Sequence, residues 1–227
     1  MLLGGLLDLG LPLRKLSQAL RQLGLSPVRI TARHIRREGV RATQVSIGQE
    51  APSSSNFRNP GEWTRWARRS QLSDPMKRSF RRAVMTLAHA EGKGHGVPFS
   101  QIRFHQLARA DTWVSLLGFC LGLAHFRIDT VCVSPIPLGS SHLDPQGRSK
   151  AVPGPATSWL LKRFTIDRRK ERFEWTTPTG AALLASFASP IPAPPLRVRG
   201  IGHAVGALRP PRGSTVLRLI LGEPIPG

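Results

Sequence analysis

The stretch that leads into the longest apolar segment carries a histidine and an aspartate that could bind a metal ion. His105 stands six residues before Asp111, and residues 111–126 predict a buried helix. Because residues six apart on one helix point about 120° apart, the two converge only if His105 precedes the helix and Asp111 caps it. The imidazole and the carboxylate could then ligate a metal such as nickel or zinc, or orient one another. The alternative is an ordinary N-cap at Asp111 and a surface or hydrogen-bonded histidine.

Two further segments could bind an anion. In GKGHGVP at 92–98, a flexible glycine-rich turn beside His95 would let backbone amides approach a phosphate while Lys93 neutralises it. Thr177, Thr179 and Gly180 open a predicted helix with two hydroxyls and free amides, although ordinary capping by Thr179 explains them equally well. Neither segment matches a known nucleotide-binding fingerprint, and the chain has no nucleophile elbow, HExxH or paired-carboxylate motif. The catalytic residues therefore stay unknown.

The charge of the chain favours anionic partners. Lysine and arginine number 33 against 13 acidic residues, for a net charge of +20 and a pI near 11.8. Nucleic acid, a nucleotide, a phosphorylated metabolite and an acidic protein all fit, and so does a general arginine bias on a solvated surface. Trp63 and Trp66 alternate with arginines and could stack on bases. The alternative is that they dock a linker onto the core.

The cysteines and apolar runs point to a compartment. Cys120 and Cys132 are far apart in apolar surroundings, which indicates neither a disulfide framework nor a cysteine zinc site. The apolar N-terminal run carries Asp8 and lacks the basic start of a signal peptide, and the run at 113–126 is too short to span a bilayer. We therefore expect a soluble cytoplasmic protein without a membrane partner.

The pattern of apolar residues predicts an α/β or α+β fold, with helices packed on a mixed sheet around a buried central helix near 111–126. Residues 1–47 predict a helix at 12–23 and a two-stranded hairpin within the same domain, and residues 48–72 predict a flexible linker or loop. The main part, residues 73–227, predicts helices and strands around a rigid proline-rich strand end at 134–139 that forms one wall of a site. Its helices are expected at 73–90, at 155–161 and from 177, and its strands at 130–133 and 214–221.

Six segments, in the same order, resemble the N-terminal region of the LarC family of nickel insertion proteins. They are MLLGGLLDLG (1–10), FHQLARAD (104–111), SPIPLGS (134–140), VPGPAT (152–157), TPTGAALL (177–184) and VLRLILG (216–222). The resemblance covers nearly the whole chain. It implies nickel insertion into pyridinium-3,5-bisthiocarboxylic acid mononucleotide during nickel-pincer cofactor biosynthesis, by a CTP-dependent chelatase of the lyase class that uses a divalent cation, manganese or magnesium.

The resemblance also implies roles for the residues above. His95, His105 and Asp111 are then the candidate metal ligands. Lys93, Thr177, Thr179 and Gly180 are the candidate nucleotide or anion contacts. The expected partners are the anionic mononucleotide, CTP and a separate LarC-like chain that carries the family's C-terminal ferredoxin-like domain, which is absent here. The family's first strand and its loop are expected to precede Met1.

The chain departs from the family pattern at the metal site. Gln106 and Ser115 replace two carboxylates, and Arg109 replaces a glycine, so a site for a hard cation loses two negative charges and gains a positive one. Two alternatives to the enzyme therefore stay open. One is an inactive, degenerate fragment, and the other is a non-catalytic module that binds nucleic acid through arginines at 65, 68, 69, 78, 81, 82, 163, 168, 169 and 172.

Overall fold

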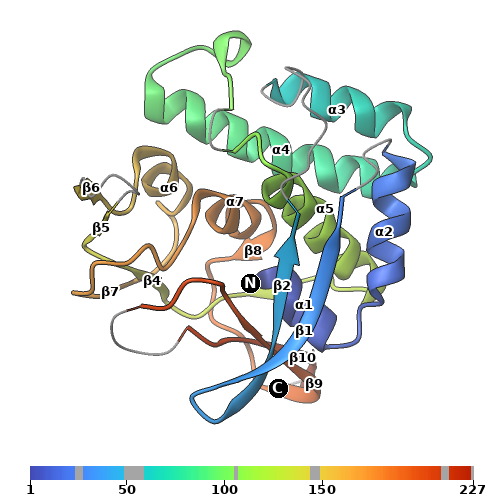
Figure 1. Cartoon of the computed structure of the whole chain (residues 1–227), viewed down its shortest axis with the longest axis vertical. Coiled ribbons are helices and arrows are strands. Elements are labelled where there is room, and N and C mark those ends of the chain that lie inside the picture. The colour runs from blue at the N-terminus through green and yellow to red at the C-terminus, as the bar shows by residue number, and fades with distance from the viewer. Residues whose placement is uncertain (24–27, 49–58, 105–106, 144–148, 211–214, 226–227) are drawn as a thin grey trace.

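The structure, a computed structural model, describes residues 1–227 apart from 24–27, 49–58, 105–106, 144–148, 211–214 and 226–227. Its helices are α1 (Leu2–Asp8), α2 (Leu13–Gln22), α3 (Pro60–Arg69), α4 (Asp74–His95), the 3-10 helix η2 (Phe99–Gln101), α5 (Ala110–His125), α6 (Pro155–Leu160) and α7 (Pro178–Phe187). The strands are β1 (Ile30–Arg37), β2 (Val40–Ile47), β3 (Val131–Cys132), β4 (Ile136–Leu138), β5 (Ser141–Leu143), β6 (Ser149–Ala151), β7 (Ile166–Arg168), β8 (Ala188–Ser189), β9 (Leu196–Val205) and β10 (Leu217–Pro224). Most helices lie in one half of the molecule and the four long strands in the other (Figure 1).

The long strands form one mixed sheet in the order β1-β2-β9-β10, as the sequence predicts for the fold class. The hairpin β1–β2 closes through Glu38 and Gly39, whose φ angles of 52° and 78° suit a two-residue hairpin turn. The hairpin β9–β10 is also antiparallel. The two hairpins join through a short parallel ladder that pairs Thr43 with Ala204 and extends by one more residue pair. This join holds the two halves of the sheet together.

Helix α1 lies between the sheet and α5. On the sheet side, a Cβ at Gly202 would lie 2.3 Å from the carbonyl oxygen of Gly5, so glycine is required for the helix to approach β9 this closely. On the other side, a Cβ at Gly118 would lie 2.7 Å from the Leu3 side chain, so this glycine lets α1 approach α5 closely. Helix α1 thereby connects the sheet to the helical core.

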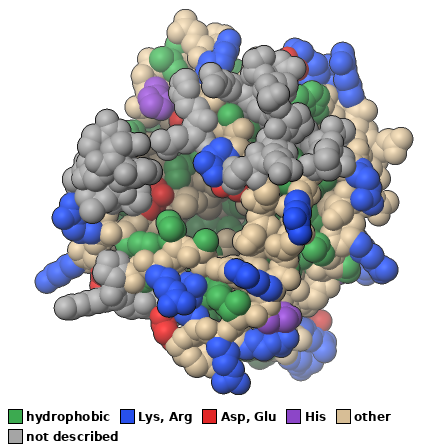
Figure 2. All heavy atoms as spheres, in the orientation of Figure 1, with side chains coloured by type: hydrophobic (Ala, Val, Ile, Leu, Met, Phe, Trp, Pro, Cys, Tyr) green, Lys and Arg blue, Asp and Glu red, His purple; other side chains and the backbone are tan. Residues whose placement is uncertain are grey.

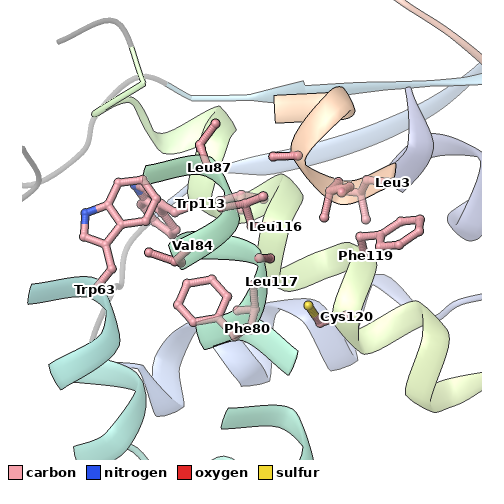
Figure 3. Close-up of a cluster of buried hydrophobic side chains, with 14 of the residues drawn as sticks. Leu3, Trp63, Phe80, Val84, Leu87, Trp113, Leu116, Leu117, Phe119 and Cys120 are labelled. Atoms are coloured by element: carbon pink, nitrogen blue, oxygen red, sulfur yellow. The ribbon is translucent and has the colours of Figure 1, made fainter. Parts of the chain in front are cut away.

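The central helix predicted from the apolar run is confirmed as α5. Its side chains are buried on nearly all sides between α1, α2, α4 and α7. Figure 3 shows the aromatic and aliphatic side chains that meet around it. Trp63 of α3 closes one end, with its ring centroid 5.1 Å from that of Phe104. Both rings are buried, so α3 is part of this core.

The structure differs from the predicted elements in several places. Residues 2–8 form α1 and residues 196–205 form β9, although neither pattern predicts regular structure. The stretch 48–72, predicted as a loop, contains α3 in its second part because the Asn59 side chain accepts from the Gly61 amide and Trp63 and Ala67 become buried. Tertiary burial therefore outweighs the loop-like composition around α3.

Candidate functional site

Helix α4 is longer than its sequence predicts. The helix, expected to end near Ala90, continues to His95 and stops at Gly96, whose φ of 68° lies in the left-handed region. The prediction of a flexible glycine-rich turn here is wrong. The amides of residues 92–95 are part of the helix and do not form an open cradle for a phosphate.

Glycine occupies these positions because other elements pack closely against the backbone here. A Cβ at Gly92 would lie 3.0 Å from the Ile102 side chain, and a Cβ at Gly94 would lie 3.0 Å from the backbone nitrogen of Ala156. The glycines therefore let α6 and the segment after η2 approach the end of α4. The glycines of this segment therefore indicate close packing of other elements and not a turn.

His95 and Lys93 sit on the exposed last turn of α4. The Nε2 atom of His95 lies 3.4 Å from a carboxylate oxygen of Glu91, one helical turn earlier. Positive side chains at this position also interact favourably with the helix dipole. A histidine and a glutamate four residues apart present one nitrogen and one oxygen ligand on the same helix face. This end of α4 can thus offer two ligands to a metal ion.

Asp111 lies at the start of α5, but it is not the cap. The N-cap is Arg109, and Asp111 stands in the first turn with its side chain about half exposed. The Arg109 Nε atom lies 3.8 Å from an Asp111 carboxylate oxygen, so the arginine added at this place pairs with the aspartate. His105 and Gln106 lie outside the described residues. The expected convergence of His105 with Asp111 stays a prediction.

The start of α7 is capped by Thr177 and not by Thr179 as the sequence analysis expected. The Thr177 hydroxyl oxygen accepts a hydrogen bond of 3.2 Å from the Gly180 amide. Pro178 has no amide proton, and the Gly180 amide donates to the cap. The Thr179 amide is therefore the donor of the first turn that the cap does not use. Capping therefore reduces, without removing, the capacity of this helix end to bind an anion.

Segments far apart in sequence meet in two places, which the packing of α6 on α7 connects. The Thr176 hydroxyl donates a hydrogen bond of 2.9 Å to the carbonyl oxygen of Pro137, which ties the entry of α7 to β4. Helix α6 packs against both α4 and α7, and a Cβ at Gly94 would lie 3.1 Å from Pro155 (Figure 1). We call these two pairs of segments, residues 93–95 with 154–156 and residues 136–138 with 176–180, the motif cluster.

The proline-rich strand end is held firmly within the motif cluster. Strand β4 pairs with β7 in parallel, and a Cβ at Gly139 would lie 2.0 Å from the carbonyl oxygen of Phe173. The Arg169 guanidinium stacks 4.3 Å from the Trp175 ring centre while its Nε donates to Asp167 at 3.0 Å. These contacts fix the backbone between β7 and α7. The wall of a site predicted at 134–139 therefore rests on a rigid scaffold.

A network around Asp8 escaped the sequence analysis. The Oδ1 atom of Asp8 accepts a 2.6 Å hydrogen bond from the Thr43 hydroxyl, and its Oδ2 atom accepts a 2.8 Å hydrogen bond from the His203 amide. The parallel ladder between β2 and β9 stops at Thr43 and Ala204, so Asp8 satisfies the amide just beyond it. In the sequence, Asp8 stands out only as a single aspartate in an apolar run, and it served there only as an argument against a signal peptide.

The same network orients the imidazole of His34. Its Nδ1 atom lies 3.1 Å from the Thr43 hydroxyl oxygen and 3.6 Å from the Asp8 carboxylate. Since the only hydroxyl proton of Thr43 goes to Asp8, the contact with His34 requires the proton on Nδ1. Nε2 then keeps its lone pair, as in histidines that ligate metals with a carboxylate behind them. His34 is half exposed and is a further candidate ligand.

Comparison with known proteins identifies the family. The family model described as nickel insertion protein matches residues 1–226. The chain belongs to this nickel insertion family. A relative from Geobacillus kaustophilus, named pyridinium-3,5-bisthiocarboxylic acid mononucleotide nickel insertion protein, is 29% identical over 98% of this chain and 56% of its own length. A relative of the same name from Akkermansia muciniphila is 30% identical over 97% of this chain and 56% of its own length.

Coverage of these relatives is partial. A protein from Syntrophobacter fumaroxidans is 35% identical over the whole of this chain, and the match spans 58% of that protein. The chain thus spans a little over half the length of the curated relatives it matches. No solved structure matches it. The family membership confirms the resemblance that the six segments indicate.

The candidate metal ligands of the described residues lie in separate places. In the described part of the chain, no three His, Cys, Asp or Glu side chains gather as a metal-holding group. Burial raises the pKa of the Cys120 thiol to about 12, so the metal-free thiol stays protonated at neutral pH. His95 with Glu91, Asp111 with Arg109, and His34 with Asp8 are separate pairs.

The arginines proposed for nucleic acid are partly occupied by the protein itself. Arg65 pairs with Glu62, and the Arg163 guanidinium donates to two backbone carbonyls at the end of α7. Arg82 stacks on Phe187, 5.5 Å from the ring centre. Trp63 is buried, which confirms the reading in which it docks the segment onto the core. Figure 2 shows Lys and Arg side chains scattered over the visible face and not gathered into one tract.

The described helices include none that is long and apolar enough to cross a bilayer.

Proposed function

We propose that this chain takes part in the insertion of nickel into pyridinium-3,5-bisthiocarboxylic acid mononucleotide, the reaction that the names of its Geobacillus and Akkermansia relatives state. The observation that carries the proposal is the motif cluster. Residues 93–95, with exposed Lys93 and His95, pack against residues 154–156 at the end of α4. Residues 176–180 are tied to residues 136–138, and these two segments and 154–156 carry or adjoin the family resemblance. An insertion site needs ligands that can release the ion again, and an exposed histidine with a carboxylate neighbour meets that need.

We propose His95, His105 and Asp111 as the groups that hold nickel in transit. Imidazole suits nickel, and no more than a few exchangeable ligands are wanted when the metal must leave for the substrate. Arg109 beside Asp111 weakens the attraction of that carboxylate for a cation. We therefore expect the histidines to contribute more than Asp111.

The anion contacts in the proposal are Lys93, Thr177, Thr179 and Gly180. Lys93 supplies positive charge, and the Thr179 amide is the helix-start donor that capping leaves over. Gly180 already donates to Thr177, so its part is to keep the backbone open for approach of the ligand. CTP with manganese or magnesium is the proposed co-substrate, and its phosphates would be drawn to a protein of charge +20.

The chain's partners and compartment are part of the same proposal. Because it spans a little over half of its relatives' length, we include among its partners a separate chain equivalent to the remainder. The two cysteines are free, and a cytoplasmic setting suits both free thiols and cofactor assembly. Lyase-class turnover is proposed for the assembled system.

The test is reconstitution of the reaction. The full chain, the separate remainder chain, the mononucleotide, nickel, CTP and manganese are mixed, and the metallated product is measured by mass spectrometry. We expect product that depends on CTP and falls about tenfold or more in His95→Ala, since one lost ligand costs on that order. His125→Ala is the matched control, because His125 also ends a helix but contacts Lys15, and its yield should stay within about twofold. Absence of product from the complete mixture, or equal yields in the two variants, would overturn the proposal.

A further inference from the structure

We propose that a second site, outside the motif cluster, binds a phosphate group. A cavity of about 220 Å³ lies between the tip of the β1–β2 hairpin and the segment that leads into β10. It is lined by Arg36, Arg37, Glu38, Arg209, Pro210 and Thr215. Three arginines against one glutamate leave an excess of positive charge in a space large enough for a phosphate and part of the molecule that carries it.

Arg37 is the key residue of this site. It is 9% exposed, and its Nη1 donates to the Gly206 carbonyl at 2.9 Å and to the Thr215 hydroxyl at 3.0 Å. Its Nε is buried and has no hydrogen-bond partner. Within the residues that the structure describes, no carboxylate forms an ion pair with Arg37. A buried guanidinium without a counter-ion is costly, so the structure leaves a place for an anion.

The guanidinium is also held in place before any ligand arrives. The Gly206 carbonyl accepts a second hydrogen bond, of 3.2 Å, from the Gln44 side chain. Gln44 in turn accepts from Arg33 at 3.2 Å. These bonds fix one edge of the Arg37 guanidinium. A planar fork with fixed orientation matches the oxygens of a phosphate, which accept paired N–H donors.

Arg36 and Arg209 complete the site from its exposed side. Both line the cavity and both are exposed, and neither forms an ion pair with a carboxylate in the described part of the chain. They would add long-range attraction and close over the bound group. Glu38, on the turn itself, faces the same cavity and disfavours anions of higher charge. The geometry therefore points to a phosphate monoester or free phosphate more than to a triphosphate.

The bound phosphate group has two candidate sources, free phosphate and a mononucleotide, and the choice of probe distinguishes them. If the site binds inorganic phosphate, the inference is independent of the proposed function, since neither nickel nor the motif cluster takes part. With a mononucleotide it rests on the proposed function, because the relatives' substrate is a pyridinium mononucleotide with one phosphate. Nicotinic acid mononucleotide is a stable pyridinium mononucleotide and serves as that probe.

The experiment is a set of calorimetric titrations of the nickel-free full chain with inorganic phosphate, nicotinic acid mononucleotide and CTP at low ionic strength. We expect saturable binding of one equivalent of at least one of the first two probes, weakened about tenfold or more in the double variant Arg36→Ala/Arg209→Ala. The double variant Arg41→Ala/Arg218→Ala is the matched control, because both arginines are exposed on the same sheet but do not line the cavity. It removes the same two charges and should weaken binding by less than about threefold.

Arg37→Lys sharpens the test, because it keeps the charge and removes the planar guanidinium fork. We expect it to weaken binding to a similar degree while circular dichroism shows a folded chain. Tighter binding of the mononucleotide than of phosphate assigns the site to a nucleotide ligand, and equal binding assigns it to the free anion. The inference is overturned if neither probe binds saturably, if CTP alone binds, or if Arg41→Ala/Arg218→Ala weakens binding as much as Arg36→Ala/Arg209→Ala. None of these outcomes depends on nickel insertion, so failure of the proposed function would not be mistaken for failure of this site.

Discussion

Between α4 and α5 the contacts are made by buried apolar side chains, whereas α1 meets the sheet through glycines and a single carboxylate. Figure 3 shows the first kind of contact, in which Phe80, Val84, Leu116 and Leu117 fill the space between helices. The second kind depends on direction, because hydrogen bonds at Asp8 and backbone approach at Gly202 tolerate little displacement. The outer face of β9 and β10 is open, with Ile201 and Ile220 about half exposed.

The difference suggests how the molecule divides its tasks. Apolar packing is non-directional and spreads its stabilisation over many side chains, which gives the helical half a rigid frame for the ends of α4 and α7. The sheet join relies on a few specific contacts. We therefore expect substitutions to be costly in both halves, but for different reasons: a lost volume in the helical half, and a lost contact or an added atom in the sheet.

The largest effect is expected from a cavity in the helical half. Leu117 is fully buried, so Leu117→Ala should lower the free energy of unfolding by about 4 kcal/mol, as for other buried leucines. Leu208→Ala makes the same change at a side chain that is 67% exposed and should cost less than about 0.5 kcal/mol. Urea unfolding followed by circular dichroism measures both. Equal costs would mean that the packing around α5 is not what stabilises this half.

An added methyl group tests the close approach in the sheet half. In Gly202→Ala the new Cβ would come 2.3 Å from the carbonyl oxygen of Gly5, and backbone must shift, so we expect a loss of about 3 kcal/mol. Gly180→Ala is the control, because its Cβ would lie 3.5 Å from the nearest atom, within α7, where alanine is the better helix former. It should be neutral or slightly stabilising in the same urea titration. A tolerated Gly202→Ala would show that α1 does not need this contact.

Removing the charge of Asp8 tests the directional hydrogen bonds of the sheet join without changing the volume of the side chain. Asp8→Asn keeps the shape but can no longer accept at both oxygens, so either the Thr43 hydroxyl or the His203 amide loses its partner, at about 2 kcal/mol. Asp129→Asn changes an exposed aspartate in the same way and should have almost no effect. Thermal unfolding of the two variants makes the comparison. Should both behave alike, the network would be incidental to the sheet join.

The smallest effect concerns the two thiols. Burial raises the pKa of Cys120 to about 12, while Cys132 lies half buried on β3. We expect a thiol reagent at pH 8 to label one cysteine quickly in the folded chain and the second only on unfolding. Because the unfolded thiol ionises near 9.0, stability from this group is complete below that pH and decreases as the pH rises above it. Rapid labelling of Cys120 would show that the helical half opens more readily than its packing indicates.

The sequence predicts those parts of the fold whose signals are local. The apolar run at 111–126, the hairpin and the helix starts at Pro155 and Thr177 follow from periodicity, turn residues and proline position. Helix α1 and strand β9 do not, because α1 is a short apolar segment that becomes regular only between the sheet and α5. The glycines at 92 and 94 were misread because a packing glycine and a turn glycine look the same in a sequence.

The candidate site was predicted unevenly for similar reasons. Resemblance pointed to three segments of the motif cluster, near residues 136, 155 and 178, but only the structure shows the hydrogen bond from Thr176 to Pro137 that joins two of them. The networks around Asp8 and Arg37 were not foreseen. Both depend on pairs of residues more than 30 positions apart, and neither chemical type nor spacing along the chain indicates such contacts.

The most direct test of the central claim is the nickel content of the purified chain, measured by element-resolved mass spectrometry after high-salt gel filtration. The account predicts close to one nickel ion per chain, lost in His105→Ala, strongly reduced in His95→Ala and kept in His125→Ala. No nickel in the unaltered chain, or nickel that is unchanged in His105→Ala and His95→Ala, would contradict the claim that these histidines carry the metal for insertion.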